Sequence, residues 1–234
     1  MARDNSEDAL TWNVFRYLER MKLLNSFLSN LSLIPQSEAD LIYWSYSQTA
    51  KGSWPELNHA RSEFGEAIKR SSEPDLIAVT DKALFFIEVK LKASNETLPS
   101  DPNNRKKYLT GGEGWFNAAF TSDFENIAIK SQKYELLRFW LLGTWLSAKM
   151  SRDFYLINIV PDIYETDIEE RFVPQLKLTD KRHFKRLAWE DVSEWICNNA
   201  PENTAKEGIL DYFQNKTVGY DQFGLLQKAF SRKI

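Results

Sequence analysis

Two hydrophobic runs separated by a polar break, in the stretch PDLIAVTDKALFFIEVK at residues 74–90, most constrain how this chain can fold. Both runs are rich in β-branched and aromatic residues, which favour strands, and the break is typical of a tight turn. A two-residue turn at Asp81 and Lys82 places Asp75 directly opposite Glu88. The stretch therefore predicts a β-hairpin whose open end carries two facing carboxylates.

The charges at this open end indicate a metal site. Lys90 follows Glu88 by two residues, so the two side chains share one face of the strand. Facing carboxylates repel unless something binds them, and Mg²⁺ usually takes one or two protein carboxylates plus water. We therefore expect Asp75 and Glu88 to bind Mg²⁺, with Mn²⁺ as a substitute, and the Lys90 ammonium to serve the attacking water or a phosphate. The alternative is an ordinary surface hairpin, but Leu84 and Phe86 on the same face favour a covered one.

Pro74-Asp75, followed after twelve residues by Glu88-Val89-Lys90 at the end of a hydrophobic strand, resembles the motif of the PD-(D/E)XK nuclease superfamily. The resemblance covers the chain from the first predicted helix to about residue 200. It implies an α/β protein with a restriction-endonuclease-like core, in which helices flank a mixed four- to five-stranded sheet. It also implies Mg²⁺-dependent hydrolysis of phosphodiester bonds in DNA.

The first helix offers a third carboxylate. Residues 5–23 have amphipathic helical spacing, and Glu7 lies at the N-terminal end of the apolar stripe. The resemblance implies that a helix before the first strand supplies a glutamate to the metal site, and Glu7 has the matching position. A capping arrangement of Asp4 with Glu7 is the alternative. Glu63, on the border of a helix predicted over 58–69, is the competing ligand.

Two further segments carry candidate substrate contacts. On the long helix predicted after the hairpin, the resemblance implies a catalytic role for Gln132, and Lys133 beside it is a candidate contact to nucleic acid. Residues 92–114 contain Pro, Gly and charged residues that predict an irregular loop. Its basic run suits a nucleic-acid backbone, and a solvated surface loop equally well. The run consists of Arg105, Lys106 and Lys107.

The remaining chain alternates strands and helices, which indicates an α/β layer architecture. Strands are predicted at 41–47, 154–160 and 184–189, and helices at 124–150, 192–198 and 219–230. No Pro- or Gly-rich linker divides the chain, so we expect one domain over residues 1–234, with its core at about 5–200 and a helical tail at 201–234.

Composition excludes several other functions. The single cysteine, Cys197, excludes an internal disulfide and a cysteine-rich zinc site, and it favours a reducing cytoplasm. No run approaches the ~18 apolar residues of a membrane span, so we expect no membrane partner. Two histidines make histidine-based metal sites and Ser-His-Asp catalysis improbable. There is no P-loop and no dinucleotide-binding glycine motif.

The sequence thus predicts a Mg²⁺-dependent DNA endonuclease of the restriction, defence or repair type. The alternative is a catalytically silent nucleic-acid-binding or scaffolding protein that retains the nuclease fold. Because the net charge is −3, DNA must be contacted by a local basic patch. The sequence leaves a homodimer open.

Overall fold

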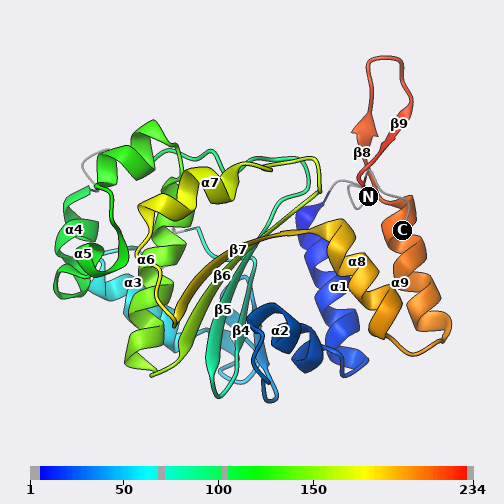
Figure 1. Ribbon diagram of the computed structural model, residues 1–234, viewed down its shortest axis with the longest axis horizontal. Coiled ribbons are helices and arrows are strands. Elements are labelled where there is room, and N and C mark those ends of the chain that lie inside the picture. The colour runs from blue at the N-terminus through cyan, green and yellow to red at the C-terminus, as the bar shows by residue number, and fades with distance from the viewer. Residues whose placement is uncertain (1–5, 68–71, 102–104, 231–234) are drawn as a thin grey trace.

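The computed structural model describes residues 6–67, 72–101 and 105–230. In this part of the chain, helices cover both faces of a mixed seven-stranded sheet with the order β3-β2-β1-β4-β5-β6-β7 (Figure 1). The strands of this sheet are β1 (Asp40–Tyr43), β2 (Tyr46–Ser47), β3 (Gly52–Ser53), β4 (Leu76–Val79), β5 (Ala83–Val89), β6 (Asp153–Val160) and β7 (Arg182–Ala188). The predicted α/β class is confirmed.

Helices precede, separate and follow the strands of this sheet along the chain. They are α1 (Glu7–Arg20), α2 (Leu24–Ser32), α3 (Pro55–Glu63), α4 (Arg105–Gly114), α5 (Phe116–Ala119), the π-helix η2 (Glu125–Lys130), α6 (Tyr134–Lys149), α7 (Ile168–Phe172), the 3₁₀ helix η3 (Val173–Gln175), α8 (Trp189–Asn199) and α9 (Thr204–Asn215). A separate two-stranded sheet consists of β8 (Thr217–Tyr220) and β9 (Leu226–Lys228). None of the described helices is long and apolar enough to span a bilayer.

The predicted hairpin register is confirmed. β4 and β5 are antiparallel, with Leu76 opposite Ile87 and Val79 opposite Leu84. Thr80 N donates to Ala83 O at 2.9 Å and closes the two-residue turn. β1 pairs antiparallel with β4, whereas β5, β6 and β7 run parallel. The carboxyl ends of these three parallel strands therefore share one edge of the sheet.

Alternate residues of β5 enter two different hydrophobic clusters. Phe85 and Ile87 pack with α1, α2, α8 and α9, whereas Leu84 and Phe86 pack with α3, α6 and α7. Glu88 has the alternation of Leu84 and Phe86, so its side chain belongs to the α6 face. α6 is buried along most of its length, as its apolar sequence predicts.

The predicted count of four to five strands is wrong because the strand expected at 41–47 is broken. Trp44 and Ser45 have φ of 47° and 59° and form a turn between β1 and β2. β2 and β3 contain two residues each, which is too short for an alternation in sequence to reveal.

The helix predicted over 124–150 is also interrupted. The π-helix η2 ends at Lys130, and α6 begins at Tyr134, because Gln132 between them has φ 53°. The expectation of an irregular loop at 92–114 is wrong in its second half, where α4 forms around a buried Tyr108 and is kinked at residues 111–113. Residues 68–71 and 102–104, parts of the predicted helix 58–69 and of this loop, lie outside the described residues.

At the C-terminus the helix predicted over 219–230 is wrong. The residues form the β8–β9 hairpin, and the helix of this region, α9, lies before it. Gly219 and Gly224 have φ of 119° and 78°, which a helix does not allow, and they stand at the bulge and in the turn of the hairpin. The apolar spacing of this segment arises from its two strands and the turn between them.

Candidate active site

The open end of the β4–β5 hairpin holds two carboxylates, of which Glu88 is buried and Asp75 half-buried. Asp75 immediately precedes β4, and its Oδ2 accepts a hydrogen bond from Val89 N at 2.8 Å. Burial raises the pKa of Asp75 to about 7, and the charge of Glu7 adds to this effect. Burial, followed by the charge of Asp75, raises the pKa of Glu88 well above its usual value. The two carboxylates therefore interact unfavourably when both are ionised.

Lys90 lies two residues after Glu88, and its side chain is on the same face of the chain. Its Nζ contacts Glu88 Oε1 and lies 3.8 Å from Oε2 of Glu135, in the first turn of α6. Burial lowers the pKa of Lys90, but the charges of Glu88, Glu135 and Asp75 outweigh burial and raise it. The side chains of Glu88, Lys90 and Glu135 are only 4%, 13% and 17% exposed. The site therefore combines a protonated ammonium with three acidic groups in a largely dry environment.

One oxygen of the site has no hydrogen-bond partner among the described residues. Glu88 Oε2 is buried and accepts no hydrogen bond from any described residue. Such an atom fits a ligand position for a hard cation. The described residues contain no group of three or more His, Cys, Asp and Glu side chains arranged to hold a metal ion.

Glu7 reaches the same edge of the sheet from α1. Its Oε1 accepts hydrogen bonds from Leu91 N at 2.8 Å and Lys92 N at 3.4 Å, just after the end of β5. Ser6 caps α1 by accepting from Ala9 N, and Asp4 lies outside the described residues. The competing Glu63 lies elsewhere, where it pairs with His59 at 3.6 Å near the surface. The structure therefore brings Glu7 and not Glu63 near the facing carboxylates.

The other candidates lie around this centre. Gln132 is exposed, and its carbonyl accepts a hydrogen bond from Thr97 N at 2.6 Å. Lys133 is only 5% exposed and lies 3.7 Å from Glu165. On α4, Arg105 and Lys106 are exposed, whereas Lys107 is half-buried and its Nζ lies 5.0 Å from the centre of the Tyr108 ring. None of these side chains contacts Asp75 or Glu88 in the described hydrogen bonds and ion pairs.

Sequence reasoning missed a polar network that adjoins Glu88. Asn158 pairs with Glu88 in the register of β5 and β6, and its amide donates to Glu165 Oε2 at 2.8 Å. Asn95 donates to Asn158 Oδ1 at 2.9 Å and, through its backbone, to Glu165 Oε1 at 2.8 Å. Glu165 therefore joins the segment after β5 to β6 and to Lys133. The signal in the sequence was a buried asparagine in the apolar strand FYLINIV.

Glu135 is the second residue that sequence reasoning missed. It contacts Lys90 and also lines a cleft. This cleft of about 600 Å³ is lined by Glu135 together with Tyr134, Arg138 and Tyr108, among other residues. An acidic residue in the first turn suits the helix dipole, so the position of Glu135 alone gave no functional signal. The cleft offers space beside Glu135, whose carboxylate contacts Lys90.

No family model matches the chain, and no curated protein or solved structure matches it either. The motif at residues 74–90 and the geometry around it therefore carry the functional assignment.

Proposed function

We propose that this protein is a Mg²⁺-dependent DNA endonuclease of the PD-(D/E)XK type, which hydrolyses phosphodiester bonds in restriction, defence or repair. The observation that carries the proposal is the pair of carboxylates formed by the half-buried Asp75 and the buried Glu88, next to the protonated Lys90. The order of the sheet supports it, because an antiparallel hairpin carries the motif and a parallel strand follows a crossover helix. Two histidines leave carboxylates and lysine as the available chemistry.

The energetics of the pair favour a bound cation. Buried carboxylates are costly unless they are paired and hydrogen-bonded, and here Asp75 raises the pKa of Glu88 further. Lys90 compensates one oxygen of Glu88, but the other oxygen has no partner among the described residues. A divalent cation would compensate both carboxylates at once.

Each residue then has a role that follows from its position. Asp75 and Glu88 would hold the Mg²⁺ or Mn²⁺ ion, and Glu7 stands at the same edge. When bound, such an ion polarises phosphate oxygens and lowers the pKa of a coordinated water. Lys90 keeps its proton, so its ammonium can donate to a phosphate oxygen and stabilise negative charge as it develops. Glu135 orients Lys90 from the first turn of α6.

The surrounding residues supply the expected route for DNA. The site lies at the carboxyl edge of β5, where ligands of open α/β sheets usually bind. The exposed Arg105 and Lys106 are proposed contacts to the phosphate backbone, together with Lys107 and Lys133. The catalytic role that the family resemblance implies for Gln132 stays a prediction, and Glu135 is the residue of that region that contacts Lys90.

The test compares cleavage of plasmid DNA by the parent and three variants in Mg²⁺ or Mn²⁺. We expect Asp75→Asn and Glu88→Gln to be inactive, because each removes a charge that holds the ion. Lys90→Ala should still bind the metal but cleave about 10²–10³ times more slowly, since it loses one electrostatic group. Glu63→Gln, which changes a similar carboxylate outside the site, should cleave like the parent.

Metal binding is measured separately from cleavage by thermal melts with and without Mg²⁺. Binding to the native state should raise the melting temperature of the parent and of Lys90→Ala, and much less that of Glu88→Gln. A parent that shows neither a thermal response to Mg²⁺ or Mn²⁺ nor nicking of DNA would favour the catalytically silent nucleic-acid-binding or scaffolding protein. Cleavage that persists in Glu88→Gln would place the active site elsewhere.

A further inference from the structure

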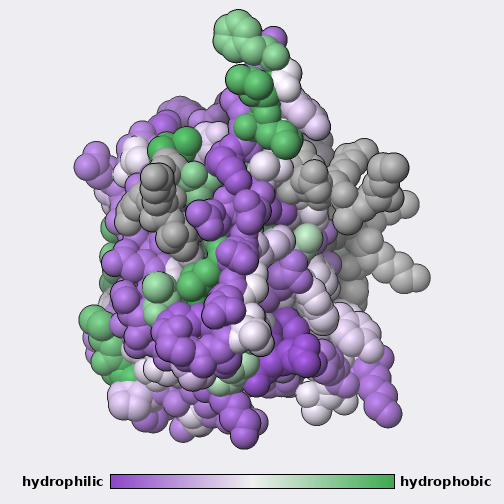
Figure 2. Space-filling view, turned by 90° about the vertical axis from the view of Figure 1, so that its right-hand side faces the viewer, coloured by the Kyte–Doolittle hydropathy of each residue, from purple (hydrophilic) through white to green (hydrophobic). Residues whose placement is uncertain are grey.

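The β8–β9 hairpin projects from the body of the molecule beside the N-terminus of α1 (Figure 1). Hydrophobic side chains gather at its tip (Figure 2). Four of them are largely exposed: Tyr220 at 69%, Phe223 at 78%, Leu225 at 66% and Leu226 at 56%. A contiguous apolar patch of this kind typically marks a surface that binds something.

Hydrogen bonds within the turn stabilise the tip of the hairpin. Asp221 Oδ1 accepts from Phe223 N at 2.8 Å and from Leu225 N at 2.9 Å, and Asp221 N donates to Leu225 O at 2.8 Å. Gly224 supplies the positive φ of 78° that the turn requires. The carboxylate at the tip is thus used by the turn, and the apolar side chains are presented on a preformed loop.

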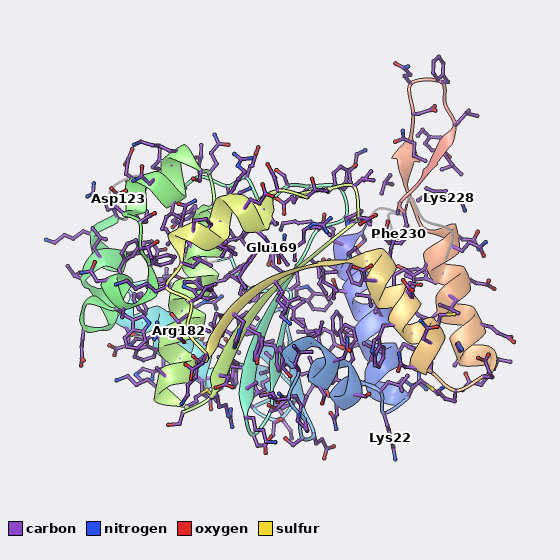
Figure 3. The ribbon with its side chains drawn as sticks, viewed as in Figure 1. Lys22, Asp123, Glu169, Arg182, Lys228 and Phe230 are labelled. Carbon is purple, nitrogen blue, oxygen red and sulfur yellow. The ribbon has the colours of Figure 1, made fainter. Side chains whose placement is uncertain are left out.

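The base of the hairpin is fixed to the core. Val218 and Phe230 are buried in the cluster that α1, α8 and α9 cover, and the Phe230 ring lies 5.5 Å from the Phe213 ring. Lys228 and Phe230 mark the returning strand at this base (Figure 3). The Lys228 Nζ donates to Gln214 O at 2.9 Å, at the end of α9. The hairpin is therefore a projection with a rigid support.

The same base adjoins the candidate active site. Lys92, whose backbone N–H donates to Glu7, also donates through Nζ to Val218 O at 3.4 Å. Lys216 Nζ donates to Ser6 O at 3.5 Å, next to Glu7. A polymer that occupies the carboxyl edge of β5 would thus pass the hairpin. Two exposed lysines lie at its base, Lys92 from the segment after β5 and Lys228 from β9, whereas Lys216 is buried.

We propose that the β8–β9 hairpin contacts the DNA substrate through its bases, as an apolar wedge beside the cleavage site. The proposal rests on the proposed function. Tyr220 and Phe223 offer rings that stack on bases, and Leu225 and Leu226 suit insertion into a groove or between base steps. The exposed Lys92 and Lys228 at its base complement the charge of the phosphates. DNA that binds at the candidate active site would thereby also contact the exposed apolar side chains of the hairpin.

The test measures DNA binding without cleavage, in chelator, by fluorescence anisotropy with a short duplex and a single strand. We expect Phe223→Ser with Leu225→Ser to weaken binding about 10-fold or more, because each lost stacking contact has an effect of this order. The slope of affinity against salt should stay the same, since no phosphate contact is removed. Phe223→Trp should retain the affinity of the parent, because its ring stacks equally well.

Leu33→Ser is the matched control. Leu33 is 82% exposed and follows α2, just before residues 35–37, which bond the turn of the β4–β5 hairpin. This turn is at the opposite end of β5 from Glu88, so the substitution should leave DNA affinity unchanged. Because the hairpin side chains are exposed, the double variant should melt at the temperature of the parent, which excludes unfolding as the cause.

Three results would overturn the inference: equal affinity of parent and double variant, a parent that binds no DNA, or a hairpin that governs association with vesicles or with a second copy instead. The inference and the proposed function fail separately. Hairpin-dependent binding without metal-dependent cleavage would contradict the nuclease and leave the hairpin contact standing. Cleavage that requires Asp75 but ignores the hairpin would contradict the hairpin contact alone.

Discussion

Glu66 and Arg138 form a buried ion pair that contrasts with the candidate active site. Glu66 accepts from Arg138 Nε at 2.7 Å and Nη2 at 2.6 Å, and from the Tyr108 hydroxyl at 2.9 Å. Burial opposes ionisation, but these bonds and the charge of Arg138 outweigh it and lower the pKa of Glu66. Both oxygens of Glu66 are therefore compensated, whereas one oxygen of Glu88 has no partner among the described residues.

Glu66→Gln should destabilise the protein strongly. Removal of one partner leaves the guanidinium of Arg138 buried without its counter-charge, which typically costs about 3–5 kcal/mol. The free energy of unfolding from urea denaturation measures this loss. Glu63→Gln, at an exposed carboxylate three residues earlier, should change the free energy by less than about 0.5 kcal/mol. Similar losses in both variants would show that the pair contributes no more than a surface charge.

At the level of single residues, sequence reasoning located groups whose positions depend on local geometry. A turn length fixes the register of a hairpin, so Asp75 and Glu88 could be placed opposite each other. Glu66 and Arg138 are separated by 72 positions, and neither lies in a pattern that predicts the other. Asn158 and Glu135 likewise gain their roles only when β6 and α6 pack beside β5. Such partners depend on the tertiary structure.

The contact between α6 and β6 depends on a close approach of helix and sheet. Gly143, in the middle of α6, faces the ring of Phe154 so closely that an added Cβ would lie 2.1 Å from Phe154 Cζ. The ring of Trp140 lies 5.6 Å from the same phenyl ring. The crossover helix that carries Glu135 is thus seated on the strand next to β5 without space for another atom.

Gly143→Ala should therefore destabilise the protein, although alanine is the better helix former. Overpacking of a dense core usually costs about 1–3 kcal/mol, which exceeds the gain of about 1 kcal/mol in helix propensity. Gly208→Ala is the matched control, because Gly208 lies in α9 and an added Cβ meets no atom within 4 Å. That variant should be stabilised. Urea denaturation of both variants would contradict the packing argument if their stabilities changed in the same direction.

At the level of elements, long regular hydrophobic patterns in the sequence predicted strands and helices well. The local breaks within these elements could not be predicted. β6 and α8 follow from their spacing, with small shifts at their ends. The breaks at Trp44-Ser45 and Gln132 place residues other than glycine at positive φ, which the sequence does not announce. The helix predicted over 219–230 is wrong because the apolar residues of this segment lie at the tip of a short hairpin and not along one face of a helix.

At the scale of the whole molecule, apolar residues cover the two faces of the sheet, and the polar residues of the candidate site lie at one of its edges. Two hydrophobic clusters cover the two faces of the sheet, as the apolar residues of the predicted strands and helices indicate. The polar groups gather where β5 ends, because this edge collects Glu88, Lys90 and the beginnings of α1 and α6. The location of the site could be predicted from the hairpin, but its surroundings required the packing of elements far apart in sequence.

The stability of the metal-free molecule should decrease as the pH rises from 5 to 8. The pKa of Asp75 is raised from 3.8 to about 7 by burial, so the folded state holds a proton that the unfolded state releases. The resulting stabilisation is complete below about pH 4 and is lost as the pH rises through about 7. Glu88, whose pKa is also raised, acts in the same direction.

Thermal melts in chelator across this pH range test the linkage by comparison with Asp75→Asn, which cannot ionise at this position. The variant should already melt higher than the parent at pH 5, and its advantage should grow by at least a further ~2–4 °C by pH 8, the shift that about 1 kcal/mol produces in a chain of this size. Glu66→Gln is the control for other pH effects. The stabilisation from Glu66 is present above its ordinary pKa of 4.5, so its difference from the parent should stay constant between pH 5 and 8. Added Mg²⁺ should raise the melting temperature of the parent more at pH 8 than at pH 5, because protons and the ion compete for the same carboxylates. A difference between the parent and Asp75→Asn that does not change with pH would show that Asp75 is already ionised at pH 5, and the argument for a strained carboxylate pair would fail.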